Sequence, residues 1–186
     1  MAAHRPPRAQ ADSPTGSIGR RLLRLARHRW AEGVLRRSFT PALLGRLTDR
    51  VAASERLHTG QIRICVEAGL PSSYLWRDAS ARERAVAQFG KLRVWDTERN
   101  NGVLIYLLQA EHAIEIVADR GLARVVTPQE WRAVIDQMSL RFRGLQYEDG
   151  LIEAIDAVSS RLVRHFPAAA DAPGHPNELP DAPVVD

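Results

Sequence analysis

The sequence predicts an α/β fold, a three-layer α/β/α sandwich around a small mixed β-sheet. The main observation is an unbroken apolar run at 103–108, rich in branched residues and opened by Gly102, which is typical of a strand buried on both faces. Alternating patterns at 61–67 and 113–117 predict one strand before it and one after it. We expect the 103–108 strand at the centre of the sheet and the 113–117 strand at an edge.

Composition indicates one globular domain with tails. The 186 residues are 45% hydrophobic and 26% charged, which is ordinary for such a domain. A single cysteine, Cys65, lies in an apolar strand, so we expect a buried structural thiol and a reducing compartment. No run approaches the roughly 18 apolar residues of a membrane span, and no secretion signal follows the Arg-rich start, so we expect a cytoplasmic protein.

The positive charge is concentrated at the start of the chain, where residues 1–39 carry nine arginines against Asp12 and Glu32. Residues 1–16 contain prolines and little apolar surface, which predicts a disordered basic tail. Residues 17–38 predict a basic amphipathic helix, with the apolar positions Ile18, Leu22, Leu25, Ala26, Trp30 and Val34. We expect this helix to dock on the domain; the alternative is that residues 17–37 contact an anionic membrane or nucleic acid.

The domain itself is expected over 39–166. Thr40 and Pro41 start a helix that runs to about Leu57, and the 61–67 strand follows it. A capping-box pattern at 80–83 starts the next helix, so the order from Gln61 to Leu108 is strand, helix, strand. This is a Rossmann-like βαβ unit with parallel strands, and the third strand returns antiparallel.

Two further helices and a tail complete the chain. A second capping box at 127–130 starts one helix, and the other is expected over about 148–165. Residues 167–186 are rich in proline and predict an extended tail, in which 177–180 could dock locally.

The predicted topology brings polar residues to one edge of the sheet, because the amino ends of the parallel strands and the carboxyl end of the antiparallel one meet there. These residues are His58, Asp96, Glu98, Asn100, Asn101, Asp119 and Arg120. Carboxylate and amide oxygens suit calcium, which takes about six to eight oxygen ligands, whereas magnesium would need fewer from the protein. The alternative is a structural role in turns and surface ion pairs. Ligand sites in open parallel sheets usually lie at the opposite, carboxyl ends.

Other kinds of site lack their patterns. The sequence contains no G-x-S-x-G nucleophile elbow, no glycine-rich phosphate loop after a strand, and no Cys/His spacing for zinc. Trp95 is expected to be a core aromatic residue that closes the crossover helix, rather than a platform for a substrate.

Two segments resemble the signature of the TPM domain family. They are 95–106, WDTERNNGVLIY, and 114–121, IEIVADRG. That family includes a thylakoid-lumen phosphatase-like protein of photosystem repair and a membrane-tethered receptor modulator. The resemblance covers about 40–166, and 58–63 with 177–181 are similar to a soluble bacterial branch. It implies the same α/β/α sandwich.

For activity, the resemblance implies calcium binding, weak acid phosphatase activity, or a binding and assembly role alone. The chain departs from the family at Asn100, where many members have aspartate, and at 118–121, where many have a glycine-rich turn. The first change removes a charge from the expected metal site and the second restores one with Asp119.

The leading expectation is a non-catalytic TPM-type module that binds a partner protein and a divalent cation through Asp96, Glu98, Asn100, Asn101 and Asp119. The second possibility is an enzyme, a metal-assisted phosphatase. In it, Asp96 or Asp119 would hold the metal and Arg120 would contact the phosphate. Anionic-surface binding through 17–37 is the third possibility, and the sequence alone leaves the choice open.

Overall fold

A computed structural model of the chain describes residues 24, 27–28, 30–168 and 176–186. Its sheet has four strands in the order β3-β2-β1-β4. Their bounds are β1 Gln61–Glu67, β2 Gly102–Leu108, β3 Ala113–Ala118 and β4 Val184–Val185. β1 runs parallel to β2, and β3 returns antiparallel to it, as predicted. β4 comes from the proline-rich segment and adds a parallel strand to the outer edge of β1.

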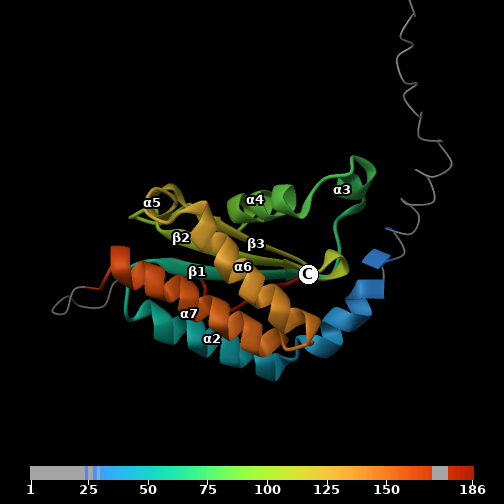
Figure 1. The fold of residues 1–186 in the computed structure, drawn as a ribbon, viewed down its shortest axis with the longest axis horizontal. Helices are drawn as coiled ribbons and strands as arrows, with labels where there is room; N and C mark the ends of the chain where they lie inside the picture. Colours follow the sequence, from blue (N-terminus) through green and yellow to red (C-terminus); the bar gives the residue numbers. More distant parts are fainter. Residues whose placement is uncertain (1–23, 25–26, 29, 169–175) are drawn as a thin grey trace, which may run out of the picture.

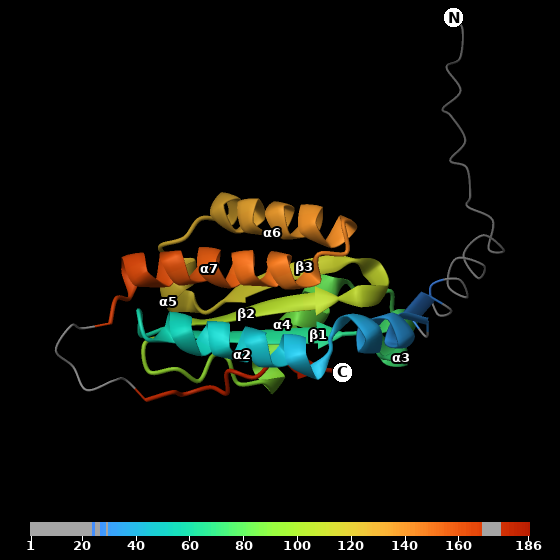
Figure 2. The same cartoon turned by 90° about the horizontal axis from the view of Figure 1, so that it is seen from below.

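Helices cover both faces of this sheet (Figures 1 and 2). One face packs against the N-terminal helix, which ends at Ser38, and against α2 Pro41–Glu55, α6 Pro128–Arg143 and α7 Tyr147–His165. The short helix α3 Ser72–Trp76 and the crossover helix α4 Ala81–Lys91 lie on the other face. The predicted three-layer α/β/α sandwich is therefore confirmed.

Local sequence signals account for where the longer helices begin. The Thr40 side chain accepts a hydrogen bond from the Leu43 N–H. Both predicted capping boxes form: Ser80 with Glu83 starts α4, and Thr127 with Glu130 starts α6. No helix was predicted for three short elements, which are α3, η1 Gln109–Glu111 and α5 Arg120–Ala123. Each is too short for a helical period to be recognised in its sequence.

The N-terminal helix docks through a different stripe from the one predicted. Ala31 and Leu35 are buried in the main core, together with Phe39 just after the helix. Trp30 and Val34, assigned to the apolar stripe from sequence, are 84% and 45% exposed. The part of the stripe that falls on 18, 22 and 25–26 lies outside the described residues. None of the helices in the described ranges is long and apolar enough to cross a membrane.

β1 is buried on both faces, although its sequence alternates. Ile62, Ile64 and Val66 enter the main core, while the alternate side chains lie under α4 and the C-terminal segment. Cys65 is a free, fully buried thiol, and burial raises its pKa to about 12. The prediction of a structural cysteine is confirmed. The prediction that Trp95 is a core residue is wrong, because Trp95 is 49% exposed and Val94 fills the buried position.

Candidate functional site

The predicted edge of the sheet exists. Gly102, at the start of β2, pairs with Gln61 of β1, and its carbonyl accepts the N–H of Asp119 at 2.9 Å. The amino ends of the two parallel strands and the carboxyl end of β3 therefore meet, as the topology predicted. Asn101 directly precedes β2 and Asp119 directly follows β3, so the two residues flank this meeting point, one residue out of register.

Asn101 is fully buried at this edge. Its backbone N–H donates to the Thr97 hydroxyl at 3.1 Å, and its side-chain amide donates to the Thr59 hydroxyl at 3.2 Å. The other side-chain atom, Oδ1, is buried without a hydrogen-bond partner. The two N–H groups of Asn101 thus fix its position through Thr97 and Thr59, and its side-chain oxygen remains available as an acceptor.

Asp119 has a similar free acceptor. Its Oδ1 accepts the Arg120 N–H at 2.7 Å as the cap of α5, whereas Oδ2 is buried without a partner. Arg120 turns to Asn100, whose Oδ1 accepts from the guanidinium Nε at 2.7 Å. Asn100 has a φ of 53°, a left-handed conformation that asparagine tolerates better than most residues. Asn100 therefore holds the Arg120 guanidinium against the 94–101 loop.

Two glycines let the 94–101 loop lie against the strands. A Cβ on Gly102 would lie 2.0 Å from the Val94 carbonyl oxygen, and one on Gly121 would lie 2.4 Å from that of Asn100. The Gly121 N–H also donates to the Asn100 carbonyl at 2.8 Å. Packing alone therefore explains the glycines of the Asn101-Gly102 and Arg120-Gly121 pairs.

The remaining predicted ligands have other partners. Asp96 is exposed and forms an ion pair with Arg93 at 3.7 Å. Glu98 is also exposed, and its backbone N–H donates to the Glu178 carboxylate at 2.8 Å. Glu178 belongs to the C-terminal segment and was not predicted at this edge. In the part of the chain that the structure describes, no three His, Cys, Asp or Glu side chains converge closely enough to hold a metal.

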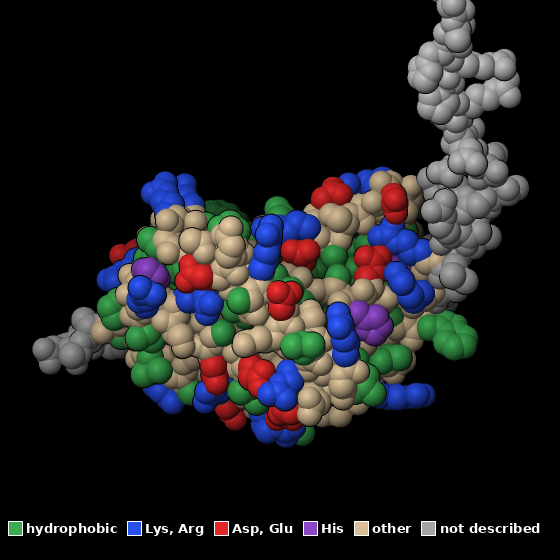
Figure 3. All heavy atoms as spheres, viewed as in Figure 1, with side chains coloured by type: hydrophobic (Ala, Val, Ile, Leu, Met, Phe, Trp, Pro, Cys, Tyr) green, Lys and Arg blue, Asp and Glu red, His purple; other side chains and the backbone are tan. Residues whose placement is uncertain are grey.

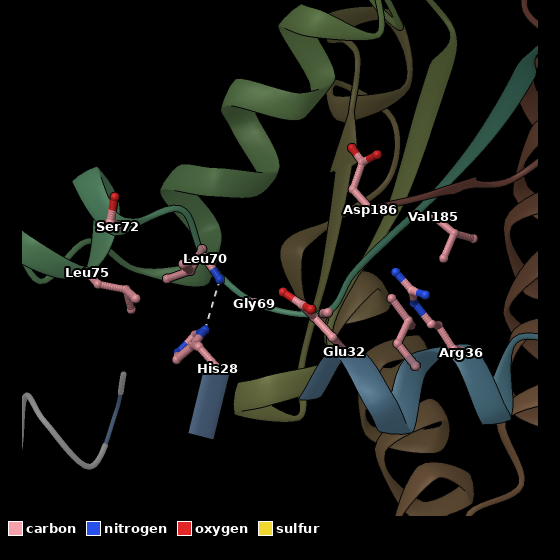
Figure 4. A pocket seen from close by; sticks show the side chains of 11 residues that line it. His28, Glu32, Arg36, Gly69, Leu70, Ser72, Leu75, Val185 and Asp186 are labelled. Carbon is pink, nitrogen blue, oxygen red and sulfur yellow. Dashed lines mark hydrogen bonds between the residues drawn. The ribbon is translucent and has the colours of Figure 1, made fainter. Parts of the chain in front are cut away.

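A hollow of about 600 Å³ lies near the carboxyl ends of β1 and β4, where ligand sites of open parallel sheets usually occur (Figure 4). No sequence pattern predicted it, because its wall combines the N-terminal helix, the β1–α3 loop and β4. The lining residues are His28, Glu32, Leu35, Arg36, Ala68, Gly69, Leu70, Ser72, Leu75, Val185 and Asp186.

His28 is a structural part of that wall. Its Nδ1 accepts the Leu70 N–H at 2.9 Å, so Nε2 carries the proton in the neutral ring and faces Glu111 at 3.2 Å. Burial lowers the pKa of His28 despite the neighbouring carboxylate of Glu111. Figure 4 shows Glu32 and Arg36 on the same helix facing the strand ends, so the polar lining contains charges of both signs.

A buried carboxylate, Glu67, lies at the carboxyl end of β1. It accepts hydrogen bonds from Arg84, from the Tyr106 hydroxyl at 2.7 Å and from the Gln88 amide at 2.6 Å. Burial alone would raise the pKa of Glu67, but these bonds outweigh it and hold the pKa below its usual value. Glu67 is therefore a charged, fully engaged structural group, and it is poorly suited to accept a proton at neutral pH.

The comparisons with known proteins agree with this architecture. The family profile described as TPM domain matches residues 35–161. The NMR structure of the BA42 protein from the psychrophilic bacterium Bizionia argentinensis is similar, with a TM-score of 0.69 and 24% sequence identity. The similarity covers 80% of this chain and 95% of BA42, and it supports the fold. A comparison with curated proteins finds no match. The chain belongs to the TPM domain family, as its segments 95–106 and 114–121 predicted.

Proposed function

We propose that the chain is a non-catalytic TPM-type binding module whose sheet edge takes a divalent cation, with calcium as the best fit. The observation that carries this proposal is the pair of buried oxygens, Asn101 Oδ1 and Asp119 Oδ2, that have no hydrogen-bond partner. A buried acceptor left unpaired costs about 1–3 kcal/mol, which a bound cation would recover. Both are hard oxygen donors, the type that calcium and magnesium prefer.

The same geometry predicts a weak site. Calcium takes about six to eight oxygens, and two side chains would leave the rest to water and backbone carbonyls. Arg120, held in place by Asn100, adds a positive charge at the same edge and opposes cation binding. Asp96 and Glu98 lie on the same loop, and their exposed carboxylates would attract the ion. We expect a dissociation constant on the order of 10⁻⁴–10⁻³ M.

A calcium titration of the full chain, followed by amide chemical shifts, tests this proposal. We expect the amides of 97–102 and 118–121 to shift, and Asp119→Asn to abolish the shift because it removes the charge while keeping the shape. Asp136→Asn, on the exposed face of α6, is the matched control and should respond like the wild type. Unchanged spectra of the folded protein at millimolar calcium would refute the cation site. Hydrolysis of an aryl phosphate that Asp119→Ala abolishes would instead favour a metal-assisted phosphatase.

The exposed side of the N-terminal helix favours a second candidate function, contact with an anionic membrane. Trp30 and Val34 border an apolar groove of about 450 Å³, together with Leu145, which is 73% exposed. Arg27 lies in the same lining and Arg37 is exposed further along the helix. Figure 3 shows hydrophobic side chains projecting at this end of the molecule, with Lys and Arg side chains beside them. Tryptophan beside arginine is typical of helices that lie at an anionic lipid surface.

Vesicle binding tests the membrane contact. We expect the full chain to bind vesicles containing phosphatidylglycerol, with a blue shift of tryptophan fluorescence, and to bind phosphatidylcholine vesicles poorly. Trp30→Ala should weaken binding about tenfold, and added salt should weaken it further. Trp76→Ala removes a tryptophan that is 72% exposed elsewhere, so it should not change binding. Equal binding by the two variants, or binding to DNA but not to vesicles, would contradict the proposal.

A further inference from the structure

We infer that the outer edge of β1 is a binding site for an extended peptide segment of the type acidic-Leu-Pro, which residues 176–186 of the same chain fill in this structure. The segment pairs with β1 through two strand residues, Val184 opposite Cys65 and Val185 opposite Val66. Two further backbone hydrogen bonds continue the pairing: Asp186 donates to the Val66 carbonyl, and its own carbonyl accepts the Ala68 N–H. This is the geometry of an added β-strand, a common way to bind peptides.

Two buried side chains of β1 are committed to this segment. The Gln61 Oε1 accepts the backbone N–H groups of Glu178 and Leu179, at 3.0 and 2.9 Å. The Arg63 guanidinium donates to the carbonyls of Pro180 and Ala182, the latter at 2.9 Å. Gln61 is fully buried and Arg63 nearly so. Glutamine and arginine are costly in the interior of a strand unless they are paired, and here their partners are peptide groups of the docked segment.

The side chains of the segment supply its specificity. Leu179 is buried in the second core cluster, on the face of the sheet that α4 covers. The Glu178 carboxylate accepts the Glu98 N–H, and Pro180, which has no N–H, leaves no backbone donor to satisfy. Asn177 and Asp181 close a local turn, with the amide donating to the carboxylate at 2.8 Å. An acidic residue, a leucine and a proline in succession therefore fit this edge.

A segment of another protein with the same order of residues would make the same contacts. It would have to displace residues 176–186, which are covalently attached and so have a high effective concentration at the site. The resident segment would then act as a built-in competitor that keeps the site closed to weak ligands. Glu178 contacts the 94–101 loop through the Glu98 N–H, but docking depends mainly on Gln61, Arg63 and the β1 edge and not on the free oxygens of Asn101 and Asp119.

The test uses the full-length chain with Leu179→Asp. This substitution disfavours docking of the resident segment without deleting any part of the chain. A fluorescent peptide of residues 176–186 is titrated in EDTA, so that no divalent cation contributes. We expect it to bind this variant about tenfold or more tightly than it binds the wild type, whose site is filled. Leu140→Asp makes the same change at an exposed leucine and should behave like the wild type. Arg63→Ala in the Leu179→Asp background should remove the binding.

A peptide that itself carries Leu179→Asp, and one with the Glu-Leu-Pro order scrambled, should both fail to bind. This comparison varies the peptide and keeps the protein the same, so it does not depend on the folding of an Arg63 variant. The proposal is overturned if the folded Leu179→Asp chain binds no peptide, or binds the scrambled peptide equally well. It is also overturned if that chain loses its circular dichroism signal, because the segment would then be an integral strand of the fold rather than a ligand.

Discussion

Glu55 illustrates how a single buried carboxyl links the fold to pH. It lies at the end of α2, and its Oε1 accepts the Ile62 N–H at the start of β1 at 2.7 Å. Burial raises the pKa of Glu55 to about 8, although the Ile62 hydrogen bond opposes the rise. The side chain is therefore mostly protonated in the folded chain at neutral pH. In the unfolded chain it would ionise near its ordinary pKa of 4.5.

Glu55→Gln should remove this pH dependence. Between pH 4.5 and 8 the unfolded state loses the proton that the folded state keeps, so the free energy of unfolding falls as pH rises. Glutamine keeps an oxygen for the Ile62 N–H but cannot ionise, so we expect the variant to gain roughly 2–4 kcal/mol above pH 8. Below pH 4.5 that gain should vanish. Urea unfolding across this range measures it, with Glu32→Gln on the exposed helix surface as the control. A variant that keeps the wild-type slope would contradict the assignment to Glu55.

At the scale of the element, the N-terminal helix offers a direct test of which stripe packs. Leu35→Ala removes a side chain from the main core and should lower the free energy of unfolding by about 2–4 kcal/mol. Val34→Ala changes the neighbouring, exposed position and should alter it by less than about 0.5 kcal/mol. Urea unfolding of both variants makes the comparison. Equal effects would mean that the helix is not packed on the domain as described.

That helix also shows a limit of periodicity. Its sequence contains two candidate stripes one residue apart, Trp30 with Val34 and Ala31 with Leu35. Larger side chains favoured the first stripe, whereas Ala31 and Leu35 of the second stripe are the residues buried in the main core. Elements with capping boxes, such as α4 and α6, were predicted well because their signals are local.

The C-terminal segment could not be placed from local signals. A two-residue strand has no detectable alternation, and its hydrogen bonds join residues more than a hundred positions apart, as in Arg63 with Pro180. The sequence alternates at Gln61 and Arg63, but nothing local indicates that a distant segment covers these two side chains. The edge holding Asn101 followed from topology, but which of its oxygens are free depends on hydrogen-bond partners such as Thr59.

At the scale of the whole molecule, the central strands join two hydrophobic clusters on opposite faces of one sheet. Successive residues of β2 alternate between them: Leu104 belongs to the cluster under α4, and Ile105 to the cluster under α2 and α7. Both side chains are completely buried. Loss of β2 would therefore expose both clusters at once, so the two helical layers should unfold in one cooperative transition.

Leu104→Ala and Ile105→Ala test this coupling from the two sides. Each should lower the free energy of unfolding by about 2–5 kcal/mol, because each leaves a cavity in a packed core. Native-state hydrogen exchange should show the most protected amides of α4 and α7 losing protection by the same amount in either variant. Leu140→Ala, at an exposed position of α6, is the control and should change neither layer. If Leu104→Ala speeds exchange in α4 alone while α7 stays at the wild-type level, the layers unfold independently and the shared strands do not couple them.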